Sequence, residues 1–225
     1  MLNTHRLRFE KAGPARYLSH LDLIRTLPRA FRRAGIAIKY TEGFNPHAAM
    51  SILLPLSVGF SSDCELLDFT LLDDLTKEEL LSRLNAALPE GLRGLGLLEP
   101  APKAGALCYA GYTARLFYDA GVPTDCAEAL TALFERESLI TEKKGKKSRQ
   151  NPSGLTAVDL RPAIRSVAFT EGEGEVRMEL VAAASLNPML LVKAIGEQLP
   201  EFAPDFASYH REMVYDGEMK PFFEK

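Results

Sequence analysis

Apolar residues in the first hundred positions change repeatedly between the two-residue spacing of a strand and the spacing of a helix. The resulting order is strand, helix, strand, strand, helix, strand. This β-α-β-β-α-β order is typical of a ferredoxin-like domain, in which two helices cover one face of a four-stranded antiparallel sheet. Strands are expected at 4–13, 36–43, 48–60 (interrupted by Pro55), 65–73 and 92–100, with the division of 49–69 left open, and helices at 17–35 and 75–88.

The same order returns after the small-residue linker 101–107, although no internal sequence repeat is visible. The sequence therefore predicts an α+β protein of two ferredoxin-like domains with antiparallel sheets, residues 1–100 and 107–225. The second domain is expected to carry a basic hairpin arm. Its strands are expected at 108–119, 139–144, 160–172, 175–183 and 208–216, and its helices at 124–136 and 187–199.

The first expected helix has clear start and stop signals. Ser19 is a favoured N-cap with Asp22 three residues later, and Gly35 is a plausible terminator. Pro28 removes one internal hydrogen bond and can kink the helix. Arginines at i, i+4 and i+7 form a basic stripe beside the apolar face, and one more arginine follows them; they are Arg25, Arg29, Arg32 and Arg33.

The net charge of −3 conceals a strong segregation of charge along the chain. Residues 1–50 carry nine basic and three acidic side chains, 51–100 carry three basic and nine acidic, and 143–165 carry seven basic and one acidic. A net-acidic protein with two concentrated basic zones can bind a polyanion locally. Two solvated basic faces without a partner are the alternative.

Several classes of protein are disfavoured by what the sequence lacks. The first residues have no apolar stretch of the signal-peptide kind, and nowhere do about 18 apolar residues run together. The three cysteines are far apart, which argues against a disulfide framework or a cysteine-based metal site. Glycine-rich phosphate loops and paired metal-binding histidines are also absent. We expect a cytoplasmic protein with no membrane span, metal or cofactor.

The segment 40–47, YTEGFNPH, is the most strongly punctuated turn of the chain and precedes an aliphatic run that reads as a core strand. Its side chains suit stacking on a nucleic-acid base and contact with phosphate. The alternative is a simple connector, whose aromatic ring plugs the core and whose imidazole caps a strand. The candidate contact residues are Tyr40, Phe44, Asn45 and His47.

His20 lies directly after the expected N-cap, where free backbone N–H groups attract anions. Its spacing from Ile24 and Phe31 also fits the apolar side of the helix, so a packed, hydrogen-bonded histidine is the alternative. His20 and His47 together invite comparison with metal-independent RNA cleavage, in which one group removes a proton and another returns one. No spacing in the sequence forces the two imidazoles together.

The second basic zone lies in a segment that is poor in apolar residues and can order on RNA. A solubilising loop is the alternative. The cations of this arm are Lys143, Lys144, Lys146, Lys147 and Arg149, and Arg161 and Arg165 continue the charge into the next expected strand.

The motifs YLSHLDL (17–23), RRAG (32–35), GFNPH (43–47), LPL-G (54–59) and VDLRPAI (158–164) have a distinctive spacing. In these motifs the chain resembles a bacterial family of unknown function known as radical-SAM-linked proteins. Its members are fused to, or encoded beside, a radical SAM protein with a B12-binding-type domain. The resemblance covers nearly the whole chain, although Ala48 stands where the family has proline. It implies association with such an enzyme and brings no catalytic residues.

The chain has no CxxxCxxC motif to hold a radical SAM cluster, so the resemblance implies an accessory role. The expected order of elements also resembles the RNA-binding architecture of CRISPR RNA-processing endonucleases. The leading hypothesis is an RNA-binding accessory protein that presents tRNA or rRNA to a radical SAM modification enzyme. The alternatives are a ribonuclease using His20 and His47, and a protein-only binding module whose arginine stripe docks on the enzyme.

Overall fold

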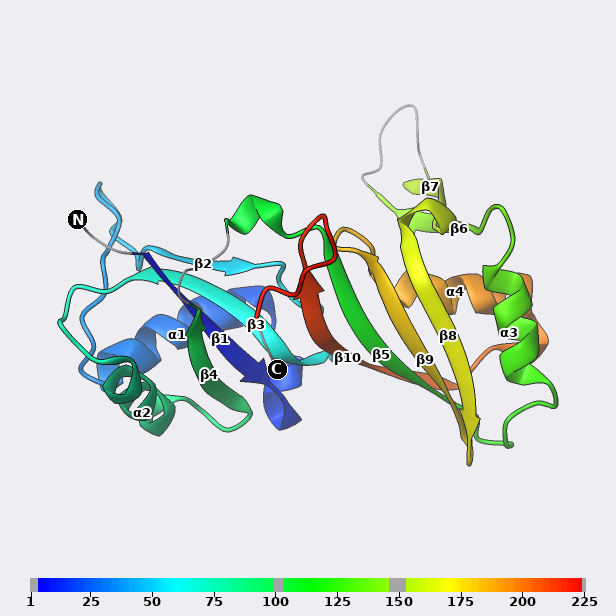
Figure 1. The fold of residues 1–225 in the computed structure, drawn as a ribbon, viewed down its shortest axis with the longest axis horizontal. Helices are drawn as coiled ribbons and strands as arrows, with labels where there is room; N and C mark the ends of the chain where they lie inside the picture. The colour runs from blue at the N-terminus through cyan, green and yellow to red at the C-terminus, as the bar shows by residue number, and fades with distance from the viewer. Residues whose placement is uncertain (1–3, 99–102, 146–152, 224–225) are drawn as a thin grey trace. The chain divides into compact units, whose positions relative to one another are not determined.

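The structure is a computed structural model that describes residues 4–98, 103–145 and 153–223 (Figure 1). It has a mixed α+β fold with four α-helices in these residues and largely antiparallel strand pairing. Two compact units divide the chain: Met1–Leu107 together with Arg211–Lys225, and Cys108–His210. The expected ranges 1–100 and 107–225 place the last fifteen residues differently.

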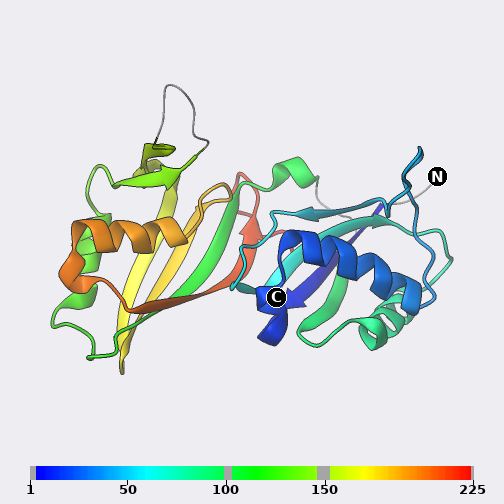
Figure 2. The same cartoon turned by 180° about the vertical axis from the view of Figure 1, so that it is seen from behind.

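The first unit is a sheet covered by two helices (Figures 1 and 2). Strand β3 pairs antiparallel with β1 along one edge and with β2 along the other, and β1 pairs antiparallel with β4. Leu7 of β1 faces Leu67 of β3 across the ladder, and both side chains are buried beneath the helices. The elements are β1 (Thr4–Lys11), α1 (His20–Arg33), β2 (Met50–Leu53), β3 (Ser61–Thr70), α2 (Lys77–Ala87) and β4 (Leu92–Leu98), with a short 3-10 turn, η1 (Gly13–Tyr17), before α1.

The second unit has strands in the order β10-β5-β9-β8, and a separate two-stranded sheet of β6 and β7. Helix α3 packs against β8, where the rings of Phe134 and Phe169 lie 5.2 Å apart, and α4 packs against β6. The elements are β5 (Tyr109–Phe117), α3 (Cys126–Phe134), β6 (Ile140–Lys144), β7 (Leu155–Asp159), β8 (Ile164–Gly172), β9 (Glu175–Ala183), α4 (Met189–Gln198) and β10 (Phe206–Tyr215). Residues 206–210 of β10 belong to this unit, and its residues from Arg211 onward belong to the first. Short 3-10 turns are η2 (Ala104–Ala106), η3 (Arg161–Ala163) and η4 (Pro200–Phe202).

Two expected strands of the first half are shorter than predicted. Residues 36–43 make only isolated bridges, Ile38 to Leu71 and Tyr40 to Ala48. The ladder goes no further because the chain turns at Thr41, whose N–H and hydroxyl bond to His47. The run 48–60 forms only β2, since Leu54 adopts a positive φ of 49° and the following proline has no N–H for a ladder. In the second half, the sequence predicts a basic hairpin arm but no strand at 155–159; in the structure β7 lies there and pairs antiparallel with β6.

A buried ion pair joins the C-terminal part of the chain to β3 within the first unit. Arg211 and Glu65 are 1% and 0% exposed, and the Arg211 guanidinium donates to the Glu65 carboxylate. A second guanidinium N–H of Arg211 donates to the Leu54 carbonyl at 2.8 Å. The Cys64 thiol donates to the backbone carbonyl of Arg211, and burial raises the pKa of this thiol to about 12.

Lys11 is the third buried charge of this region, at 0% exposure on the same face of β1 as Leu7 and Phe9. Its ammonium nitrogen has no hydrogen-bond partner among the described residues. Burial lowers the pKa of Lys11; Glu65 opposes that shift and Arg211 adds to it. The three side chains form a buried charge cluster, which we call the Arg211 cluster.

Replacing Arg211 with Met should destabilise the protein by about 3–5 kcal/mol, because the Glu65 carboxylate would stay buried without its main cation. Equilibrium urea unfolding measures the loss. The double variant R211M/E65L should recover part of it, since the Arg211–Glu65 pair is then gone and Lys11, whose pKa burial already lowers, can lose its proton.

Arg83→Gln is the matched control, because the Arg83–Glu79 pair of α2 is exposed and should contribute under about 1 kcal/mol. Equal stabilities for R211M and R83Q would contradict a structural role for the buried pair.

Candidate nucleic-acid interface

Helix α1 presents a row of arginines to solvent because its apolar side chains are anchored to the sheet. Leu23, Leu27 and Phe31 are buried in the core of the first unit. The four arginines predicted for RNA contact, Arg25, Arg29, Arg32 and Arg33, are all exposed. The basic stripe predicted from the sequence is therefore present on the surface of this helix.

A capping box fixes the start of α1. The Ser19 hydroxyl accepts from the Asp22 N–H at 3.2 Å, and the Asp22 carboxylate accepts from the Ser19 N–H at 3.1 Å. Hydrogen bonds from Ser19 hold the pKa of Asp22 below its usual value. His20, directly after the cap, is exposed, so the interpretation of it as a packed histidine is wrong.

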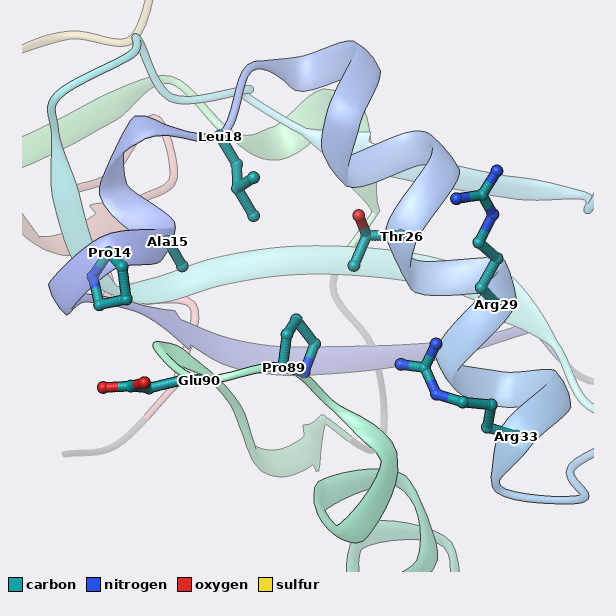
Figure 3. A pocket seen from close by; sticks show the side chains of 8 residues that line it. All are labelled: Pro14, Ala15, Leu18, Thr26, Arg29, Arg33, Pro89 and Glu90. Atoms are coloured by element: carbon teal, nitrogen blue, oxygen red, sulfur yellow. The ribbon is translucent and has the colours of Figure 1, made fainter.

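A hollow of about 330 Å³ lies between α1, η1 and the turn from α2 to β4 (Figure 3). Arg29 and Arg33 border it on the helix side, and the Arg33 guanidinium donates to the Ala87 carbonyl at 2.6 Å. The Glu90 carboxylate points away from both guanidinium groups in Figure 3. The remaining lining is Pro14, Ala15, Leu18, Thr26 and Pro89. We call this hollow the Arg29–Arg33 pocket.

Gly91 sets the distance between two walls of this pocket. Its carbonyl accepts from the Ala12 N–H at 2.8 Å, and its φ is +82°. A Cβ at this position would lie 2.3 Å from the Ala12 carbonyl oxygen and 2.9 Å from the Ala15 Cβ. Only glycine therefore allows the turn to contact η1 this closely.

The loop 41–47 is braced at its base. The Thr41 hydroxyl accepts from the His47 N–H at 3.1 Å, the Thr41 N–H donates to the His47 carbonyl at 2.8 Å, and His47 Nδ1 lies 3.1 Å from the same hydroxyl. At its exposed end, Phe44 has a relative exposure of 107%. Phe44 therefore does not plug the core, and the interpretation of the turn as a core connector is wrong in this respect.

The loop and the arginine helix meet at one contact. The Arg32 guanidinium donates to the Tyr40 hydroxyl at 3.3 Å, so the end of α1 touches the base of the loop. The segment between α1 and β2 then projects from the unit (Figures 1 and 2). Asn45 is exposed on the same loop. The structure thus joins Arg32 with Tyr40, and it places Phe44 and Asn45 further along a protruding loop.

The two histidines of the ribonuclease alternative are not brought together by any described contact. His20 begins α1, and the loop with His47 follows the other end of this 14-residue helix, which spans about 20 Å. His47 instead borders a separate hollow of about 280 Å³, beside Thr41, Asp68 and Thr70. The geometry gives no support to an acid–base pair of imidazoles.

The second basic zone belongs to the other unit. Lys143 and Lys144 are exposed on β6, Arg165 is exposed on β8, and the half-buried Arg161 donates to the Ile164 carbonyl at 3.3 Å. The remaining predicted contacts, Lys146, Lys147 and Arg149, lie outside the described residues.

Sequence reasoning missed the apolar wall of the pocket and the Arg211 cluster. The wall had no local signal, because Pro14 and Pro89 belong to segments far apart in the chain. The Arg211 cluster did have a local sequence signal. Lys11 continues the alternation of Leu7 and Phe9, and Glu65 continues that of Leu67 and Phe69. A charge at an inward position of a strand predicts a buried pair.

Among residues 4–98, 103–145 and 153–223, no three His, Cys, Asp or Glu side chains gather as metal ligands would. No helix within those ranges combines the length and apolar character needed to cross a membrane.

The protein has a mixed α+β fold, and the same arrangement of elements is found in a chain of a solved protein complex. A chain in the "Crystal Structure of a Cbf5-Nop10-Gar1 Complex" matches with a TM-score of 0.51 at 12% identity, over 96% of this chain and 50% of that one. A chain in the "Structure of H/ACA RNP bound to a substrate RNA containing 2'-deoxyuridine" gives 0.48 at 11% identity, over 96% and 48%. The protein thus spans about half the length of these solved chains, and the likeness is one of fold alone.

The chain belongs to the family described as "Uncharacterized protein conserved in bacteria (DUF2344)", whose family model matches residues 5–190. This agrees with the expected membership of a bacterial family of unknown function. No curated protein matches the sequence.

Gly91→Ala should destabilise the first unit by about 1–3 kcal/mol, because the new Cβ would overlap Ala12 and Ala15. Gly35→Ala is the control: its φ of +65° is also positive, but a Cβ there meets nothing within 4 Å, so it should cost only about 1 kcal/mol of left-handed strain. Thermal unfolding of both variants measures the difference. A smaller loss for Gly91→Ala than for Gly35→Ala would contradict the close approach.

Proposed function

We propose that the protein is an RNA-binding accessory subunit, which holds an RNA on α1 and the loop 41–47 while a separate enzyme modifies it. One observation carries the proposal: the fully exposed ring of Phe44 sits on a braced loop whose base touches the arginine row of α1. A large apolar ring held in water costs free energy unless a partner covers it. Stacking on a base is a use that fits the neighbouring cations.

The arginines supply the second half of the interface. Exposed guanidinium groups contact phosphates of any sequence, and their number sets the salt dependence of binding. Arg25, Arg29 and Arg32 project from a helix that is capped and packed, so little backbone entropy is lost when they engage a strand. Tyr40, Asn45 and His47 would add polar contacts on the loop.

We further infer that the two units are ferredoxin-like domains. In the first, β4, β1, β3 and β2 follow one another across the sheet; in the second, the order is β10, β5, β9 and β8. In the second unit, β6 and β7 are taken as an inserted hairpin and are left out of the count. Both orders then place the fourth and first strands of a β-α-β-β-α-β unit beside each other. This inserted pair carries Lys143 and Lys144, which would extend RNA contact in the second unit.

For the enzyme, we propose a radical SAM protein with a B12-binding-type domain, acting on tRNA or rRNA in the cytoplasm. The motifs YLSHLDL, GFNPH and LPL-G support this partner through their resemblance to radical-SAM-linked proteins. An exposed apolar pair, Tyr17 and Leu21, each 63% exposed, offers such an enzyme a contact next to the arginine row.

Binding of bulk tRNA should weaken steeply as salt rises, because arginine–phosphate contacts release counterions. Each of the variants Arg25→Gln, Arg29→Gln and Arg32→Gln should lower the slope of log affinity against log salt by about 0.7–0.9. Fluorescence anisotropy with labelled tRNA measures the slopes.

Arg83→Gln on the exposed face of α2 is the matched control and should leave the slope unchanged. Absence of binding at low salt would end the proposal. If the three arginine variants of α1 bind with the same salt slope as the Arg83→Gln control, RNA does not contact these arginines.

A further inference from the structure

We propose that the Arg29–Arg33 pocket receives a single phosphorylated nucleotide unit of the RNA, with the phosphate on the two guanidinium groups and the base and ribose against the apolar wall. This inference rests on the proposed RNA binding and goes beyond it, because a surface that only follows the backbone needs no hollow. It assigns a ligand class to one cavity of the first unit.

The phosphate side of the pocket is built from α1. Arg29 and Arg33 are four residues apart, so they are neighbours on one face, where like charges repel. The hydrogen bond from Arg33 to the Ala87 carbonyl uses one N–H and orients the group, which leaves other donors for a ligand. An anion between two guanidinium groups relieves their repulsion, and phosphate suits the fork geometry of arginine.

No acidic group competes for this position within the described lining of the pocket. Glu90 is the only carboxylate in that lining, and Figure 3 shows it directed away from both arginines. The hydroxyl of Thr26, on α1 between the arginines and Leu18, adds a neutral hydrogen-bonding group to the lining. The electrostatics of the pocket therefore favour an anion.

The opposite wall is apolar. Pro14 and Ala15 come from η1, Leu18 from the residues before the cap, and Pro89 from the turn after α2. Proline and leucine side chains offer an apolar surface that contacts a base without requiring a specific hydrogen-bond pattern. A wall of this kind predicts binding that is tolerant of base identity.

The size of the pocket limits what can enter. A volume of about 330 Å³ lies at the lower end of the range of about 300–1,000 Å³ for small-molecule sites. Such a hollow has room for one nucleotide and not for a base pair. The 5′ end of a strand and an internal unit turned out of a loop both fit this description, since both present the same phosphate and base.

Isothermal titration of the full chain with UMP, AMP and uridine tests the inference. UMP and AMP should bind with similar affinity and uridine about tenfold or more weakly, because it lacks the phosphate. Arg29→Gln should weaken UMP binding about tenfold, and Glu90→Gln should strengthen it. Arg29 is the variant of choice, since Arg33 also supports the fold through Ala87.

Arg25→Gln separates this site from the wider surface. It removes the same charge one turn away and outside the pocket lining, so it should lower the RNA salt slope while UMP affinity stays within about twofold. Arg83→Gln should change neither. The affinities of decauridine with a 5′-phosphate and with a 5′-hydroxyl are then compared. Tighter binding of the phosphorylated form would assign the pocket to the 5′ end of a strand. Equal binding of both forms, with UMP competing, would assign it to an internal nucleotide.

The failures of the two proposals are distinguishable. If tRNA binds with the predicted slopes but UMP does not bind, or binds equally well to Arg29→Gln, the pocket inference is overturned and RNA binding stands. If neither tRNA nor UMP binds, both are overturned.

Discussion

The buried ion pair of Arg211 and Glu65 is the contact on which the arrangement of the first unit depends. Arg211 also holds the Leu54 carbonyl, at a residue whose positive φ would otherwise be disfavoured. The chain from Leu54 then reaches Gly59, whose N–H donates to the Arg16 carbonyl of η1 at 2.8 Å. A charge contributed from near the C-terminus thus fixes the turn that supports η1.

From η1 the same line of contacts continues to the candidate site. The Ala12 N–H donates to the Gly91 carbonyl, which positions the turn of Pro89 and Glu90 against η1. Helix α1 starts directly after η1, at the Ser19 capping box. The pocket therefore has three walls that are each tied by hydrogen bonds to fixed backbone. A preformed pocket of this kind loses little entropy when it binds a ligand.

Local features of the site could be predicted from the sequence. Ser19, Asp22 and Gly35 define α1 through contacts within a few residues, and the arginine spacing follows from the helix period alone. The alternation of Ile38 and Tyr40 predicts a strand over the segment 36–43. Its pairing is limited to isolated bridges because Thr41 bonds to His47 and closes a turn there. The strand propensity of single residues does not predict whether the chain continues the strand or closes this turn.

Long-range features were beyond the sequence pattern. The pocket needs Pro14 and Pro89 side by side, and this proximity comes from the close approach at Gly91. Residues 211–225 group with the first unit, and the Arg211–Glu65 pair that ties them to β3 spans 146 positions. The exposure of Phe44 could not be decided from its neighbours either, because the same residues fit a core plug; the Thr41–His47 brace decides it by holding the loop outward.

The most direct test of RNA binding on α1 and the loop 41–47 uses the absence of tryptophan from the chain. Phe44→Trp places a single indole on the loop, and Leu72→Trp places one at another exposed apolar position of the same unit. If bases stack on the loop, tRNA should quench the fluorescence of the Phe44→Trp variant and leave that of the Leu72→Trp control nearly unchanged. The tRNA concentration at half-maximal quenching should equal the binding midpoint measured by anisotropy. Saturable tRNA binding without quenching of Phe44→Trp, or no tRNA binding at all, would contradict the account.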